Sequence, residues 1–275
     1  MKTQFFAGLF AAATTLTVAI SHTAPATAYD IKGRDQAPAN FNIQEFKDFV
    51  GKEARYLSPE TIGAHRLDIT KIKMNFDHDV KVYFIGETAG AYRNQLNFTA
   101  TNGSQVTGGK IFGDTSCKPG QDIANFGEFC GNPNNPLANK AKEEQPLNVG
   151  DFAELGKFKA GTEFDFQLVS NGINGGIWNN GVQGIFGLND ATNPDKLQHV
   201  MAYYYKDFLV LGYEDLWGGG DKDYNDTVFA IDFGKNNARE VAGISVPEPS
   251  ATVALIGAAA VGIFASRRSR PKQVD

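Results

Sequence analysis

From Leu67 to Phe233 the sequence alternates apolar and polar residues in short runs, which Gly, Asn, Asp and Pro interrupt. Successive side chains of a β-strand point to opposite faces, so a period of two predicts strands with one buried face. The expected strands lie within 67–76 and at 80–85, 95–99, 105–112, 162–169, 182–188, 199–205, 208–213 and 227–233. A regular alternation of strands with helices is missing, which argues against a doubly wound α/β fold. We therefore predict a mainly β chain, folded as an antiparallel, jelly-roll-like β-sandwich.

One or two short helices are expected before the strands. Asn42 precedes a helical pattern that places Ile43, Phe46 and Phe49 on one face. Ser58 and Pro59 have the residue types of a helix cap and a first helical turn. Together with the strands, these helices define one expected domain over residues 29–240.

The first 28 residues have the features of a secretory signal peptide. Lys2 gives the positive start, an apolar run extends from Phe5 to Ile20, and Ala26-Thr27-Ala28 fits the small-residue rule for cleavage. The alternative is a membrane anchor, for which the run is short. We therefore expect residues 1–28 to be removed and the remainder to be exported.

The C-terminal end contains three features in a fixed order. A linker at 241–249 carries Pro247-Glu248-Pro249, an uncharged segment occupies 250–266, and a basic tail follows at 267–275. An apolar helix of this length is slightly short for a hydrocarbon core, and the positive-inside rule keeps its arginines in the cytoplasm. A simple tail anchor is the alternative interpretation.

This order closely resembles the PEP-CTERM sorting signal. The resemblance implies processing by an exosortase and the secretion machinery of a Gram-negative bacterium, with transient insertion of the 250–266 helix into the inner membrane. It also implies a final location at the cell surface, the outer membrane or the extracellular matrix.

The charge balance limits the partners. The chain has 26 basic and 31 acidic residues, a net charge of −5, and its expected sorting ends hold more basic than acidic residues. The exported body is therefore still more acidic. A nucleic-acid partner is excluded because it would require a basic face, whereas divalent cations suit an acidic surface.

Two cysteines, Cys117 and Cys130, lie in a glycine-containing segment. Export exposes them to an oxidising compartment, so we predict a disulfide between them. Free thiols or a metal pair are the alternatives.

A dense acidic segment gives the clearest indication of function. Six oxygen-bearing side chains fall within thirteen positions: Glu214, Asp215, Asp221, Asp223, Asn225 and Asp226. Calcium takes six to eight oxygen ligands in flexible geometry, and so many carboxylates would repel one another without a cation. The spacing differs from an EF-hand, because Asp226 stands where that loop needs glycine. A solvated acidic turn is the alternative.

The segment Tyr213 to Asp226, which contains Gly219-Gly220-Asp221-Lys222-Asp223-Tyr224-Asn225-Asp226, resembles domain-of-unknown-function family 4114. Two further blocks agree with this family: one spans 82–96, and the other contains Asn193-Pro194-Asp195 and His199. The resemblance implies a secreted β-rich domain associated with calcium, without an established reaction. It adds Asp195 as a weaker ligand that would close the site, and His199 as a hydrogen-bond partner of an outer carboxylate.

Two other function classes are open. A carbohydrate-binding module for extracellular polysaccharide would stack sugars on Trp178 or Trp217, although we favour a core position for Trp178. A carboxylate-dependent hydrolase, such as a glycoside hydrolase, needs only a pair of acidic residues, which any acidic domain offers. The sequence contains no recognisable nucleophile or metalloprotease motif. We therefore predict an exported, calcium-binding, non-enzymatic protein with no catalytic residues.

Overall fold

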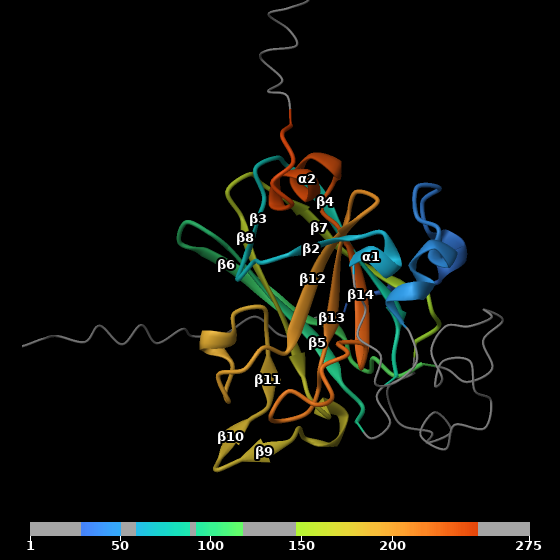
Figure 1. The fold of residues 1–275 in the computed structure, drawn as a ribbon. Helices are drawn as coiled ribbons and strands as arrows, with labels where there is room; N and C mark the ends of the chain where they lie inside the picture. The colour runs from blue at the N-terminus through green and yellow to red at the C-terminus, as the bar shows by residue number, and fades with distance from the viewer. Residues whose placement is uncertain (1–28, 51–58, 89–91, 118–146, 247–275) are drawn as a thin grey trace, which may run out of the picture.

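The computed structural model describes residues 29–50, 59–88, 92–117 and 147–246. Within them, two antiparallel sheets contain most of the strands (Figure 1). The larger sheet has the order β1 (Ile31–Lys32), β7 (Phe152–Phe158), β4 (His78–Gly86), β14 (Thr227–Asp232), β13 (Phe208–Tyr213), β12 (Val200–Tyr205) and β2 (His65–Leu67). The smaller sheet has the order β11 (Ile185–Phe186), β8 (Glu163–Val169), β5 (Gln95–Asn102) and β6 (Gln105–Phe112), with β3 (Ile72–Lys73) also paired to β8.

Aromatic side chains fill the space between the two sheets. The Phe112 ring of β6 stacks on the Phe229 ring of β14, with centroids 5.7 Å apart. The Tyr213 hydroxyl of β13 donates a hydrogen bond to the Phe166 carbonyl oxygen of β8 at 3.2 Å. These contacts join the facing surfaces of the sheets, and the predicted antiparallel β-sandwich is confirmed.

The N-terminal segment covers the opposite face of the larger sheet. The 3-10 helix η2 (Ile43–Phe49) begins after Asn42, whose side chain accepts a hydrogen bond from the Gln44 N–H. Its Phe46 and Phe49 rings pack edge-on against Tyr205 of β12, at 5.5 and 5.2 Å. Strands β13 and β14 are consequently buried on both faces, which explains why most of their residues are apolar.

Both expected N-terminal helices are present, although the first is a 3-10 helix and the second, α1 (Pro59–Ile62), has a single turn. The strands β1, β7 and β9 (Trp178–Asn179) and the C-terminal helix α2 (Lys235–Val241) were not predicted. The strand expected at 182–188 is interrupted, because Val182–Gln183 forms β10, which pairs with β9, and Ile185–Phe186 forms β11. Short 3-10 turns complete the fold: η1 (Arg34–Gln36), η3 (Gly172–Asn174) and η4 (Asp190–Thr192).

Several predictions concern residues outside the described ranges: the signal peptide at 1–28, the Pro247-Glu248-Pro249 motif, the 250–266 helix and the 267–275 tail. In the described part of the chain, no helix has both the length and the apolar character needed to cross a membrane. Cys117 is buried, but Cys130 lies outside the described residues, so the disulfide stays a prediction.

Candidate metal centre

The acidic loop, residues 214–226, connects β13 to β14 in the middle of the larger sheet. Its backbone has positive φ angles at Gly218, Gly219 and Gly220, and again at Lys222 (68°) and Tyr224 (57°). Positive φ is costly for residues that carry a Cβ atom, and such conformations concentrate at functional sites. At Gly220, a Cβ atom would collide with the Glu214 carboxylate.

Three carboxylates of the loop converge. Glu214, Asp221 and Asp223 each have an oxygen atom within 4.8 Å of the others. One Glu214 oxygen, Oε1, accepts a hydrogen bond from the Tyr224 N–H at 2.7 Å. The other, Oε2, is buried and has no hydrogen-bond partner among the described residues. A buried acceptor without a donor is costly, and a cation would satisfy it.

The electrostatics of Glu214 agree with this geometry. Burial, followed by the negative charges of Asp221 and Asp223, raises the pKa of Glu214 to about 7, against the opposing effect of the nearby Tyr224 and Lys222 N–H groups. Asp221 is exposed, whereas Glu214 and Asp223 are buried. The cluster is therefore closed on the protein side and open on one side to solvent, from which water would supply the remaining ligands of a bound cation.

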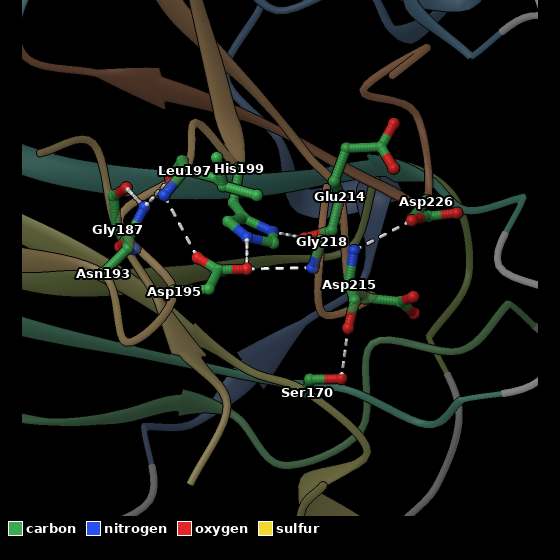
Figure 2. Close-up of polar contacts among 10 residues, drawn as sticks. All are labelled: Ser170, Gly187, Asn193, Asp195, Leu197, His199, Glu214, Asp215, Gly218 and Asp226. Atoms are coloured by element: carbon green, nitrogen blue, oxygen red, sulfur yellow. Dashed lines mark hydrogen bonds and ion pairs between the residues drawn. The ribbon is translucent and has the colours of Figure 1, made fainter. Parts of the chain in front are cut away.

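Asp215 and Asp226 form a second group. The Asp215 N–H donates to Asp226 Oδ2 at 2.9 Å (Figure 2), and Asp215 Oδ2 accepts a hydrogen bond from Asn94 at 2.8 Å. The Ser170 hydroxyl donates to the Asp215 carbonyl oxygen at 2.6 Å. Burial raises the pKa of both carboxyl groups, and their mutual repulsion adds to this effect at Asp226.

Asp195 lies in a third group, outside the three-carboxylate cluster. Its Oδ2 accepts the Gly218 N–H and contacts His199 Nε2, both at 2.9 Å (Figure 2). His199 Nδ1 lies 3.1 Å from the Glu214 carbonyl oxygen. Partial burial opposes ionisation of Asp195, but hydrogen bonds from Gly218 and His199 lower its pKa. Asp195 therefore holds the acidic loop in two ways. It binds the Gly218 N–H directly, and it contacts His199, which lies beside the Glu214 carbonyl oxygen.

Asn225 is fully buried and faces the β4 end of the sheet. Its backbone oxygen accepts hydrogen bonds from the Thr88 N–H and hydroxyl at 3.2 and 3.0 Å, and its side-chain oxygen also contacts that hydroxyl. The seven residues predicted as ligands are thus divided. Glu214, Asp221 and Asp223 come together. The other four form hydrogen bonds that hold the loop in place: Asp215 with Asp226, Asn225 with Thr88, and Asp195 with Gly218.

Sequence reasoning did not assign a role to the polar groups behind the loop. Glu87 is buried, accepts the Cys117 N–H at 2.8 Å, and has its pKa raised by burial to about 8. Arg93 and Asp114 form a buried ion pair. Arg93 and Asn94 lie in one of the blocks that resemble the family, but nothing in their spacing indicates that Asn94 reaches Asp215 across 121 positions.

The two tryptophans have different environments. Trp178 is exposed, so the expectation of a core position was wrong; it lies on the β9–β10 hairpin rather than under a sheet. Trp217 is half-buried in the acidic loop, where its ring meets Phe186 edge-on at 6.0 Å. Phe186 also stacks on His199 at 3.7 Å, so Trp217 belongs to the support of the loop.

Two family models match the chain. Residues 158–234 match the domain of unknown function (DUF4114), a range that includes β8 to β14 and the whole acidic loop. Residues 245–269 match the PEP-CTERM protein-sorting motif. Both predicted resemblances are confirmed, although the block at 82–96 lies outside the matched range. No curated protein and no solved structure matches the chain. The sorting motif marks the chain for exosortase processing and export toward the surface of a Gram-negative cell.

Proposed function

We propose that this protein is an exported, non-enzymatic β-sandwich that binds calcium at Glu214, Asp221 and Asp223 and acts at the cell surface or in the extracellular matrix. The buried Oε2 atom of Glu214 carries the proposal, because it accepts no well-formed hydrogen bond among the described residues and lies beside two further carboxylates. Calcium favours this set of hard oxygen ligands, and an exported protein encounters it.

The supporting groups favour a structural role for the ion. His199 has both ring nitrogens within hydrogen-bond distance of Asp195 and Glu214, so it holds the loop and has no nitrogen left to transfer a proton to a substrate. Bound calcium would offset the repulsion among the three carboxylates and stiffen the connection between β13 and β14.

The test is calcium titration of the exported protein by calorimetry, together with melting temperatures in calcium and in chelator. Saturation at about 100 times the dissociation constant should add about 2.7 kcal/mol to the free energy of unfolding. Glu214→Gln and Asp223→Asn should each weaken binding strongly. Asp79→Asn, which alters an exposed carboxylate of β4 at the other end of the sheet, is the matched control. Absence of calorimetric binding with an unchanged melting temperature would refute the proposal.

A further inference from the structure

The β9–β10 hairpin forms a small separate sheet and carries the most exposed large apolar side chain of the described residues. Trp178 is 61% exposed. In Figure 1 the hairpin lies at the end of the molecule opposite α2. The other aromatic side chains of the described residues are buried or half-buried, and tryptophan, which combines an apolar ring with a polar N–H, is enriched at binding interfaces.

The hairpin holds Trp178 in one orientation. The indole Nε1 donates a hydrogen bond to the Gly175 carbonyl oxygen at 2.9 Å. Asn180 and Gly181 have φ angles of 50° and 78°, as the two central residues of a type I′ turn require. Because the ring is already fixed, little side-chain entropy would be lost when a ligand covers it.

Main-chain hydrogen bonds attach the hairpin to the sandwich. Ile177 donates to the Ser170 carbonyl oxygen at 3.1 Å, and Ser170 donates to the Gly184 carbonyl oxygen at 3.0 Å. Gly184 in turn donates to the Ile177 carbonyl oxygen at 2.9 Å. These hydrogen bonds hold the hairpin, and with it the Trp178 ring, in a fixed position relative to the sandwich.

The chemistry around the ring identifies the class of ligand. Residues 171–189 contain no charged side chain but include five asparagines and one glutamine, in a chain that is 21% charged. Trp178 pairs with Gln183 across the hairpin, so the ring and an amide share one face, whereas Asn179 and Val182 share the other. Amides donate and accept hydrogen bonds as sugar hydroxyls require, and an aromatic face covers the apolar face of a pyranose ring.

We propose that Trp178 and Gln183 form a contact site for the pyranose rings of a neutral polysaccharide. The uncharged, amide-rich surroundings favour a neutral ligand over an anionic polymer, which would be attracted by basic residues that this segment lacks. The site stands independently of the calcium proposal, because none of the three converging carboxylates belongs to the hairpin.

The experiment is affinity electrophoresis of the exported protein through gels that contain dextran, galactomannan, a soluble β-1,3-glucan or a soluble β-1,4-glucan, with alginate as the anionic comparison. We expect retardation by at least one neutral polymer. Trp178→Ala should weaken that binding about tenfold, Gln183→Ala should weaken it less, and Trp178→Phe should preserve part of it.

The matched control is Val182→Ala, which removes an exposed apolar side chain from the opposite face of the same hairpin and should leave binding unchanged. Melting temperatures of all variants verify that the sandwich is folded. In a Trp217→Phe background, sugar binding should also change the fluorescence of the remaining tryptophan. Failure of every neutral polymer to bind, binding by alginate alone, or full binding by Trp178→Ala would overturn the proposal.

Discussion

The side chain of Asn237 makes four hydrogen bonds to backbone groups. It is buried on α2, and its Oδ1 accepts the N–H groups of Asn75 and Phe76, both at 2.8 Å. Its Nδ2 donates to the carbonyl oxygens of Phe76 and Phe233 at 2.9 and 2.8 Å. One side-chain amide thus joins the segment before β4 to the residue after β14. It provides hydrogen bonds to main-chain groups that lie beyond the paired part of these strands.

Replacing this amide should destabilise the fold. Asn237→Ala would leave several main-chain groups unsatisfied, and the expected loss is about 2 to 3 kcal/mol in the free energy of unfolding. Urea denaturation measures this loss. The neighbouring Asn236→Ala, at an exposed position of the same helix, should change the stability by less than about 0.5 kcal/mol. Equal effects of the two substitutions would show that helix propensity, and not the amide, explains the loss.

Among residues, the sequence identifies the three converging carboxylates better than the groups that support them. Asp221 and Asp223 were identifiable because ligand spacing is local, and Glu214 because it lies in the same acidic segment. Asn94 and Ser170 were not identifiable, since each flanks a strand of the smaller sheet and reaches the acidic loop only when the two sheets are brought together. Trp178 was misplaced because composition does not distinguish a hairpin tip from a core strand.

The acidic loop depends on a close approach between it and β13. A Cβ atom at Gly212 would collide with the Tyr224 carbonyl oxygen. Tyr224 also donates its N–H to Glu214, so the placement of the Tyr224 backbone affects the geometry of the carboxylate cluster. Glycine at position 212 is required by this contact between an interior strand and the loop that follows it.

Gly212→Ala should therefore weaken calcium binding as well as stability, because the loop must move away from the strand. Calorimetric titration and thermal melting measure the two effects. Gly156→Ala on β7 provides a control, since a Cβ atom there meets no atom within 4 Å but is strained by a φ of 95°. That substitution should lower stability while calcium affinity is retained. An unchanged affinity in Gly212→Ala would contradict the proposed dependence of the cluster on this contact.

At the level of elements, strands with clear alternation or apolar continuity were predicted, including β4, β5, β8, β13 and β14. Strand β7 was not, because Glu154, Gly156 and Lys157 interrupt its apolar pattern. It becomes a strand through pairing with β1 and β4. Helix α2 was missed because it is short and contains two consecutive asparagines, and its stability comes from tertiary contacts such as those of Asn237.

For the whole molecule, several buried carboxyl groups determine the response to pH. Burial raises the pKa of Glu87 to about 8 and of Glu214 to about 7, and it also raises those of Asp215 and Asp226. Each folded-state pKa is higher than the unfolded value of about 4. The folded protein then binds more protons than the unfolded chain between these values, so its stability falls as pH rises through that window.

Without calcium, the protein should be more stable near pH 5 than near pH 8. Calcium should stabilise it most at the higher pH, because the ion binds the ionised carboxylates. Melting temperatures measured from pH 4 to 9, with calcium or with a chelator, test both statements. Glu87→Gln should reduce the pH dependence of the chelated protein. A chelated protein whose melting temperature increases steadily up to pH 8 would contradict this prediction.

The sorting motif makes a prediction for the chain in its host. Replacement of Pro247, Glu248 and Pro249 by alanine should block exosortase processing, so that the unprocessed chain accumulates in the inner-membrane fraction. Immunoblots of cell fractions measure its size and location. Pro271→Ala, outside the matched range of 245–269, should be processed normally. Normal processing of the triple-alanine variant would show that recognition depends on other residues.

The acidic loop precedes the first residue of β14, and α2 begins shortly after the last residue of this strand. Six residues of strand span about 20 Å, so the acidic loop and α2 lie at opposite ends of β14. The sorting segment follows α2 in the sequence, whereas the Trp178 hairpin is attached at Ser170, which also bonds to the acidic loop. The domain therefore has a proximal and a distal pole. If the sorting segment enters the membrane before it is processed, both proposed binding sites would belong to the distal pole, where soluble ions and polymers arrive first.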